Sequence, residues 1–63
     1  MFYKYTVTYP KGTIFEGYAM SDKSKLDVRL GIEKQFFGMF ILEIEEYGTK
    51  FPQDVNSDYI MSV

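Results

Sequence analysis

Three glutamates in the second half of the chain are the side chains best suited to chemistry. Glu43 and Glu45 share one face of an extended strand, and Glu46 follows directly. Paired carboxylates can take a hard cation or act as an acid and base pair. Alternating glutamates are also ordinary on a solvent-facing strand, and a catalytic pair needs a cleft that 63 residues can hardly build. We therefore expect no enzyme activity and no catalytic residue.

The chain lacks the two residue types on which most metal and nucleophile sites depend. Without cysteine or histidine there is no thiolate zinc site, no disulfide and no His-activated nucleophile. Asp54, Asn56 and Asp58 have the spacing of the first ligands of a calcium loop, but the glycine and the closing glutamate are missing. We expect a turn there, and neither a metal nor a cofactor.

The tyrosines are a second group with functional potential. Sheets that carry aromatic side chains with lysines nearby can stack single-stranded bases. The candidates for such a face are Tyr3, Tyr5, Tyr9 and Tyr18, with Lys4 and Lys11 nearby. The net charge of −2 and the scattered seven basic residues argue against a phosphate-binding surface. A small single-stranded nucleic-acid-binding domain that uses this tyrosine-rich sheet face stays an alternative, with nucleic acid an unlikely partner.

The first part of the chain has the period-two pattern of β-strands. Residues 2–9 and residues 13–20 are rich in β-forming types. In the first segment one face holds Tyr3, Tyr5, Val7 and Tyr9, and the other holds Phe2, Lys4, Thr6 and Thr8. Pro10 and Gly12 lie between these segments, as in a three-residue hairpin turn. Gly17 predicts either a β-bulge or a close approach of the helix.

The middle of the chain is expected to form a helix and then a strand. Ser21 or Ser24 can cap a helix that continues to Gly38, where glycine suits the helix end. Residues 39–47 then have the pattern of a central strand, and residues 59–63 that of a short closing strand.

A second interpretation of the helical segment stays open. Residues 26–33 alternate apolar and polar side chains, which is also a strand pattern. The serine cap and the helix-favouring segment 33–35 favour the helix. If the segment were a strand, the fold would become a five-stranded small β-barrel.

These elements predict one α+β domain spanning residues 1–63. Its fold is a small two-layer sandwich, ββαβ(β), in which one helix lies on one face of an antiparallel sheet. A right-handed crossover makes the third strand parallel to the second, and therefore antiparallel to the first if it lies beside it. We expect the sheet order 2-1-3-4.

The helix has two apolar stripes, although a helix on a sheet needs one. Leu26, Leu30 and Phe37 form one stripe, and the other is formed by Val28, Ile32 and Phe36. The extra stripe predicts either a surface for a partner or a second copy, or cover by the 48–58 loop through Phe51 and Val55. The residues that we expect at a protein interface are Leu26, Leu30, Phe37, Tyr3, Tyr5 and Tyr18.

The functional expectation is a non-enzymatic protein-binding module. Its partner would be a host protein or a second copy, and a self-assembling homodimer is a further alternative. No run approaches 18 apolar residues and no apolar leader segment is present, so we expect neither a membrane span nor export, and place the protein in the cytoplasm.

The sequence also resembles the small epsilon subunit of Gram-positive bacterial RNA polymerase, which has been compared with a phage inhibitor of that polymerase. The resemblance covers residues 2–44. It consists of Phe2-Tyr3-Lys4, Phe15-Glu16-Gly17, a serine at the helix entry, Asp27-Val28-Arg29, and Phe37 before an apolar strand. It implies an accessory or inhibitory protein, of the kind phages and mobile elements encode, that docks on a large enzyme and has no activity of its own. No binding residue is carried over from it.

Overall fold

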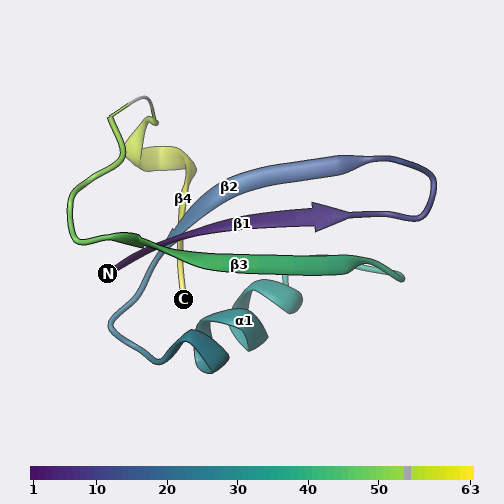
Figure 1. Ribbon diagram of the computed structural model, residues 1–63, viewed down its shortest axis with the longest axis horizontal. Helices are drawn as coiled ribbons and strands as arrows, with labels where there is room; N and C mark the ends of the chain where they lie inside the picture. Colours follow the sequence, from purple (N-terminus) through teal and green to yellow (C-terminus); the bar gives the residue numbers. More distant parts are fainter. Residues whose placement is uncertain (54) are drawn as a thin grey trace.

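In the computed structural model, which describes residues 1–53 and 55–63, the chain forms a mixed sheet with one α-helix on one face (Figure 1). The elements in chain order are β1 (Phe2–Thr8), β2 (Ile14–Met20), α1 (Lys25–Glu33), β3 (Ile41–Gly48), the 3-10 helix η1 (Ser57–Tyr59) and β4 (Ile60–Ser62). The predicted small α+β sandwich is confirmed. The β-barrel alternative is wrong, because residues 25–33 are helical and the sheet is open.

β1 and β2 form the predicted hairpin. The turn is held by two backbone hydrogen bonds, from Tyr9 N–H to the Thr13 carbonyl (2.9 Å) and from Gly12 N–H to the Tyr9 carbonyl (2.9 Å). The register sets Tyr5 opposite Gly17 without interruption, so the predicted bulge is absent from this hairpin. A Cβ at Gly17 would lie 2.5 Å from the Tyr5 hydroxyl oxygen. The close approach at Gly17 is therefore made by a cross-strand ring and not by the helix.

The strand order is β3-β1-β2-β4. β3 pairs antiparallel with β1, as predicted. The predicted place of the last strand beside β3 is wrong, because β4 pairs in parallel with β2 and makes the sheet mixed. Apolar packing explains this position. Met61 of β4 lies opposite the buried Ala19 of β2 and packs against the core, whereas β3 carries three exposed glutamates.

The helix begins where the sequence predicts and ends earlier. The Ser24 hydroxyl accepts a hydrogen bond from Asp27 N–H (3.3 Å), which makes Ser24 the N-cap. The predicted continuation to Gly38 is wrong, because α1 ends at Glu33. The chain leaves the helix so that the Phe36 ring can pack on Tyr5, with ring centroids 6.1 Å apart. Gly38 has a φ of 90° in the connection to β3 and is not a helix cap.

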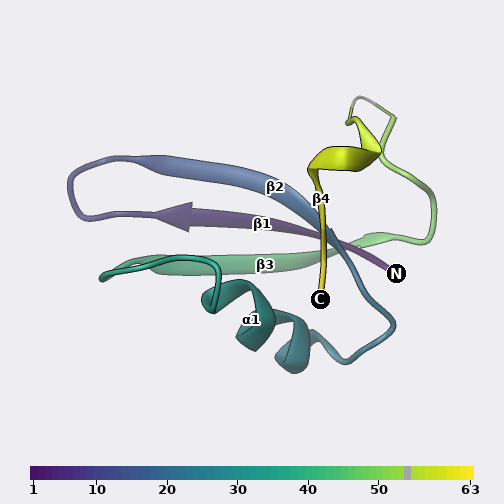
Figure 2. The same ribbon diagram turned by 180° about the vertical axis from the view of Figure 1, so that it is seen from behind.

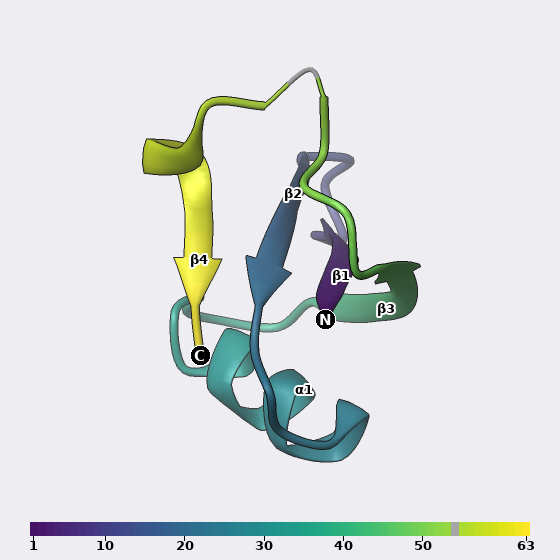
Figure 3. The same ribbon diagram turned by 90° about the vertical axis from the view of Figure 1, so that its left-hand side faces the viewer.

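The core lies between α1 and one face of the sheet. Figures 2 and 3 show α1 against this face, while the segment that follows β3 lies on the opposite side. The core residues are Tyr3, Tyr5, Val7, Ala19, Val28, Ile32 and Leu42. The last residue, Val63, also reaches the helix, since a Cβ at Gly31 would lie 3.0 Å from the Val63 Cβ.

Candidate protein-binding surface

The three glutamates of β3 lie on an open strand. Their side chains are exposed, with Glu43 and Glu45 on the face away from α1 and Glu46 opposite Tyr3 on the other face. Among the described residues, no group of three or more acidic, His or Cys side chains is placed to hold a metal ion. In the calcium-like segment, Asp54 lies outside the described residues, and the Asn56 side-chain oxygen accepts a hydrogen bond from Asp58 N–H (3.0 Å), as in a turn.

The structure divides the predicted tyrosine face. Tyr3 and Tyr5 are 4% and 9% exposed and lie beneath α1, where the Tyr3 hydroxyl donates a hydrogen bond to the Lys23 carbonyl (3.2 Å). Burial raises the pKa of the Tyr5 phenol above its ordinary value of 10.0. Tyr18 belongs to the opposite face of the sheet. Tyr3 and Tyr5 are thus core residues and not surface, and the rings do not form one platform.

The predicted helix stripe is exposed but shorter than expected. Leu26 is 66% exposed and Leu30 is 49% exposed, one turn apart on α1. Phe37 is 86% exposed but lies beyond the helix end, in the connection to β3. Val28 and Ile32 of the other stripe are buried. Only Leu26 and Leu30 therefore remain as an exposed apolar stripe on α1.

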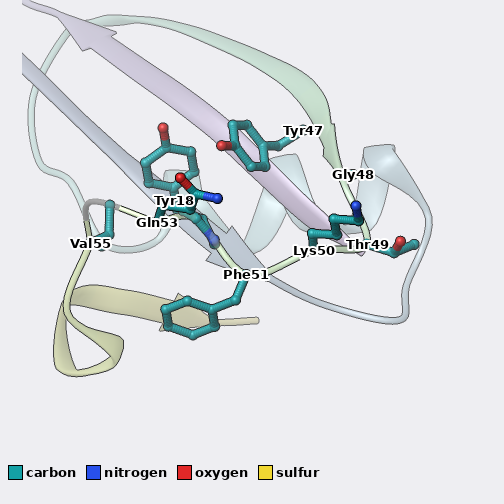
Figure 4. A pocket seen from close by; sticks show the side chains of 9 residues that line it. Tyr18, Tyr47, Gly48, Thr49, Lys50, Phe51, Gln53 and Val55 are labelled. Carbon is teal, nitrogen blue, oxygen red and sulfur yellow. The ribbon is translucent and has the colours of Figure 1, made fainter.

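The segment after β3 does not cover this stripe. The Phe51 ring packs edge-on against Phe2, with centroids 5.6 Å apart. Val55 lines a pocket with Tyr18 and Tyr47, whose rings are edge-to-face at 5.0 Å (Figure 4). These contacts lie on the sheet face opposite α1. The predicted cover of the helix by the 48–58 loop is therefore wrong.

A cluster of aromatic rings lies at the end of the molecule near the hairpin turn. Its rings come from the hairpin turn directly after β1, from β2, and from the connection between α1 and β3. The centroid distances are 6.0 Å for Tyr9–Phe15, 5.7 Å for Tyr9–Phe40, 5.8 Å for Phe15–Phe36 and 6.0 Å for Phe36–Phe40. The Tyr9 hydroxyl also donates a hydrogen bond to the Phe37 carbonyl (2.9 Å), which ties the connection to the hairpin turn. This cluster gives the connection a fixed support.

The connection then turns other apolar side chains outward. Phe36 and Phe40 are half-buried in the cluster, whereas Phe37 and Met39 between them are 86% and 82% exposed. Two adjoining pockets here share Tyr9, Pro10 and Met39. We call the exposed apolar residues that line them the end surface: Phe15, Phe37, Met39 and Ile41.

Of the end surface, only Phe37 is among the residues that the sequence predicts at an interface. Met39 and Ile41 belong to a segment predicted as a central strand, whose side chains are expected to be buried on both faces. A detectable signal was the length of the apolar run on both sides of Gly38, from Phe36 to Leu42, which exceeds what one short helix end and one strand can bury. The two most exposed residues of the end surface, Phe37 and Met39, thus lie where the helix has stopped and β3 has not yet started.

In the described part of the chain, no helix is long and apolar enough to cross a membrane. No family model, no curated protein and no solved structure matches this chain.

Proposed function

We propose that this protein is a non-enzymatic binding module that docks on a larger host protein through the end surface. Its role would be that of an accessory or inhibitory protein acting on a host protein complex, as phages and mobile elements encode. The proposal includes a cytoplasmic location, because a complex of the kind that the resemblance implies acts there.

The observation that carries this proposal is the near-complete exposure of Phe37 and Met39 on a supported connection. Large apolar side chains that gather on one exposed surface commonly mark a contact with another protein. Because the aromatic cluster and the Tyr9 hydrogen bond hold the connection, docking would order little additional chain. Apolar anchors of this kind supply most of the affinity of an interface.

Affinity capture with tagged protein from host lysates tests the proposal, with the captured proteins identified by mass spectrometry. The informative comparison is between the wild type and the double variant Phe37→Ser/Met39→Ser. A host protein captured in stoichiometric amount by the wild type should be lost by this variant. Unfolding by urea should show that the variant keeps its stability to within about 0.5 kcal/mol, because both side chains are exposed.

The matched control is Leu26→Ser/Leu30→Ser, which removes two exposed apolar side chains from α1 instead. We expect this control to capture the same protein as the wild type. Loss only in the helix variant would move the binding surface to α1, and equal capture by all three proteins would show that neither surface binds the partner. The absence of any stoichiometric partner would remove the proposal altogether.

Self-assembly is a second candidate, favoured by the exposure of Leu26 and Leu30 on α1. A homodimer formed through α1 should dissociate in the variant Leu30→Glu, because the interface would then bury an unpaired charge. Light scattering of both proteins checks this, and a dimer that persists in the variant does not use α1. The single-stranded nucleic-acid alternative loses support, because two of the tyrosines it needs are core residues.

A further inference from the structure

β3 forms one edge of the sheet. Within residues 1–53 and 55–63, it pairs with β1 alone. Its eight residues are continuous, and the irregular pairing with β1 is confined to the step between Phe2 and Tyr3, at the Gly48 end. Because backbone groups along a strand alternate in direction, half of the N–H and C=O groups of β3 point away from β1. A second extended chain could therefore pair along most of β3.

The charged side chains of β3 are all negative. Glu43 and Glu45 are exposed on the face away from α1, and Glu46 is exposed on the other face. The register sets Lys4 of β1 opposite Glu45, while Glu43 lies opposite the uncharged Thr6. Opposite charges directly across a strand pair stabilise the pair, and like charges destabilise it. The edge therefore selects among incoming strands by their charge.

A second copy of the chain is a poor occupant of this edge. In a two-fold antiparallel pairing centred on Ile44, Glu43 of each copy would lie opposite Glu45 of the other, on the same face. The two like-charged pairs oppose this assembly. A strand with lysine or arginine at alternate positions would instead place a basic side chain opposite each glutamate.

We propose that β3 accepts an extended segment of a partner protein as an additional strand, and that this segment carries lysine or arginine opposite Glu43 and Glu45. Main-chain hydrogen bonds would supply affinity, and the charged side chains would supply specificity. This inference rests on the proposed function, because it requires a protein partner. Ile41 joins the two surfaces, since it is the first residue of β3 and also part of the end surface.

The test uses a short capped peptide of alternating lysine and valine, with amide hydrogen exchange and chemical shifts of the intact protein measured by NMR. On binding, alternate amides of β3 should become protected, while those of β2 stay unchanged. Two further peptides carry N-methyl groups on one or the other set of alternate amides. One of them should bind like the parent and the other should fail, because only one set of amides faces β3.

The charge rule is tested with Glu43→Lys/Glu45→Lys, which should bind the basic peptide roughly 30-fold more weakly and bind a peptide of alternating glutamate and valine instead. The matched control is Glu16→Lys, which reverses a charge on the same face but on β2, in the row with Thr6 and Glu43. This control should change the affinity less than threefold.

The inference is overturned if the basic peptide leaves the β3 amides unprotected, or if both N-methylated peptides bind alike. In that case the glutamates only keep the edge from pairing with other chains. Pairing of β3 between two copies, seen as a dimer by light scattering with protected β3 amides, would also overturn it. The capture experiment with the end-surface variant tests the proposed function independently. If a captured partner depends on Phe37 and Met39 while β3 stays unpaired, the proposed function holds and only the inference about β3 fails.

Discussion

At the scale of single residues, Tyr5 connects the hairpin to the aromatic cluster. Its ring covers Gly17 on the neighbouring strand and meets the Phe36 ring on its other side. Two neighbours thus confine a side chain that is only 9% exposed. Glycine at position 17 is therefore a requirement of packing, because any Cβ there occupies the place of the ring.

Substitution of Gly17 by alanine should destabilise the protein by about 1–3 kcal/mol, because the Tyr5 ring cannot move away without displacing Phe36. Urea unfolding measures this change. In a Tyr5→Leu background the same substitution should cost less than half as much. Glu16→Ala, on the exposed face of the same strand, is the control and should stay within about 0.5 kcal/mol of the wild type. An equal cost in both backgrounds would mean that the ring does not lie over Gly17.

The raised pKa of Tyr5 predicts a loss of stability at alkaline pH. The unfolded chain ionises this phenol near pH 10.0, while the folded protein holds the proton to higher pH because the ring is buried. The contribution of Tyr5 is therefore complete below about pH 10 and is lost as the pH rises through the folded-state pKa. From about pH 9 to about pH 11, Tyr5→Phe should lose less free energy of unfolding than the wild type. Parallel curves for the two proteins would contradict this.

At the scale of elements, α1 is short and depends on its first turn. Nine residues give few internal hydrogen bonds, so a helix of this length is not stable by itself in water. Packing of Val28 and Ile32 and the cap at Ser24 hold it. The early end at Glu33 in turn frees the segment that carries Phe37 and Met39, so the length of α1 determines whether the end surface exists.

Removal of the cap in Ser24→Ala should lower the free energy of unfolding by about 1 kcal/mol, because Asp27 N–H loses its partner. Ser24→Asp should keep most of the stability, since aspartate caps a helix equally well. Thermal unfolding followed by circular dichroism compares the three proteins. If alanine and aspartate cost the same, the hydroxyl of Ser24 does not act as a cap.

At the scale of the whole molecule, the C-terminal end of the chain contacts both the sheet and the helix. β4 lies beside β2, and Val63 continues from β4 onto α1 at Gly31 (Figure 3). The Val63 N–H also donates a hydrogen bond to the Met20 carbonyl (3.3 Å). The last strand thus covers the edge of β2 from Tyr18 to Met20, and β3 keeps the longest run of backbone without a neighbouring strand among the described residues.

A double-mutant cycle of Gly31→Ala with Val63→Gly tests the contact between Val63 and α1. Alanine favours the helix by up to about 1 kcal/mol over glycine, but its Cβ would lie 3.0 Å from the Val63 Cβ. We expect Gly31→Ala to give no gain in the wild type and a gain of about 1 kcal/mol in the Val63→Gly background. Urea unfolding of the four proteins measures the coupling. The same gain in both backgrounds would show that Val63 does not pack on α1.

Sequence alone determined the features that depend on neighbouring residues. The hairpin follows from the two alternating segments and the Pro10 and Gly12 turn, and the start of α1 follows from the Ser24 cap. The faces of β1 were also predictable, because the period of two places Tyr3, Tyr5 and Val7 together. These features are local, since they depend on backbone preferences and on contacts only a few residues apart.

The tertiary structure decided everything that required a choice between distant partners. One such choice is whether the tyrosine face packs on α1 or faces solvent, and another is whether the last strand pairs with β2 or β3. The sequence pattern is compatible with both outcomes in each case, and the packing of the whole chain selects one. The end of α1 belongs here too, because beyond the helix Phe36 packs against Tyr5 and Phe40, and the local sequence does not specify these contacts. Most of the end surface could not be predicted from the sequence for the same reason. Phe37 and Met39 are exposed because their neighbours Phe36 and Phe40 pack against rings that are distant in the sequence.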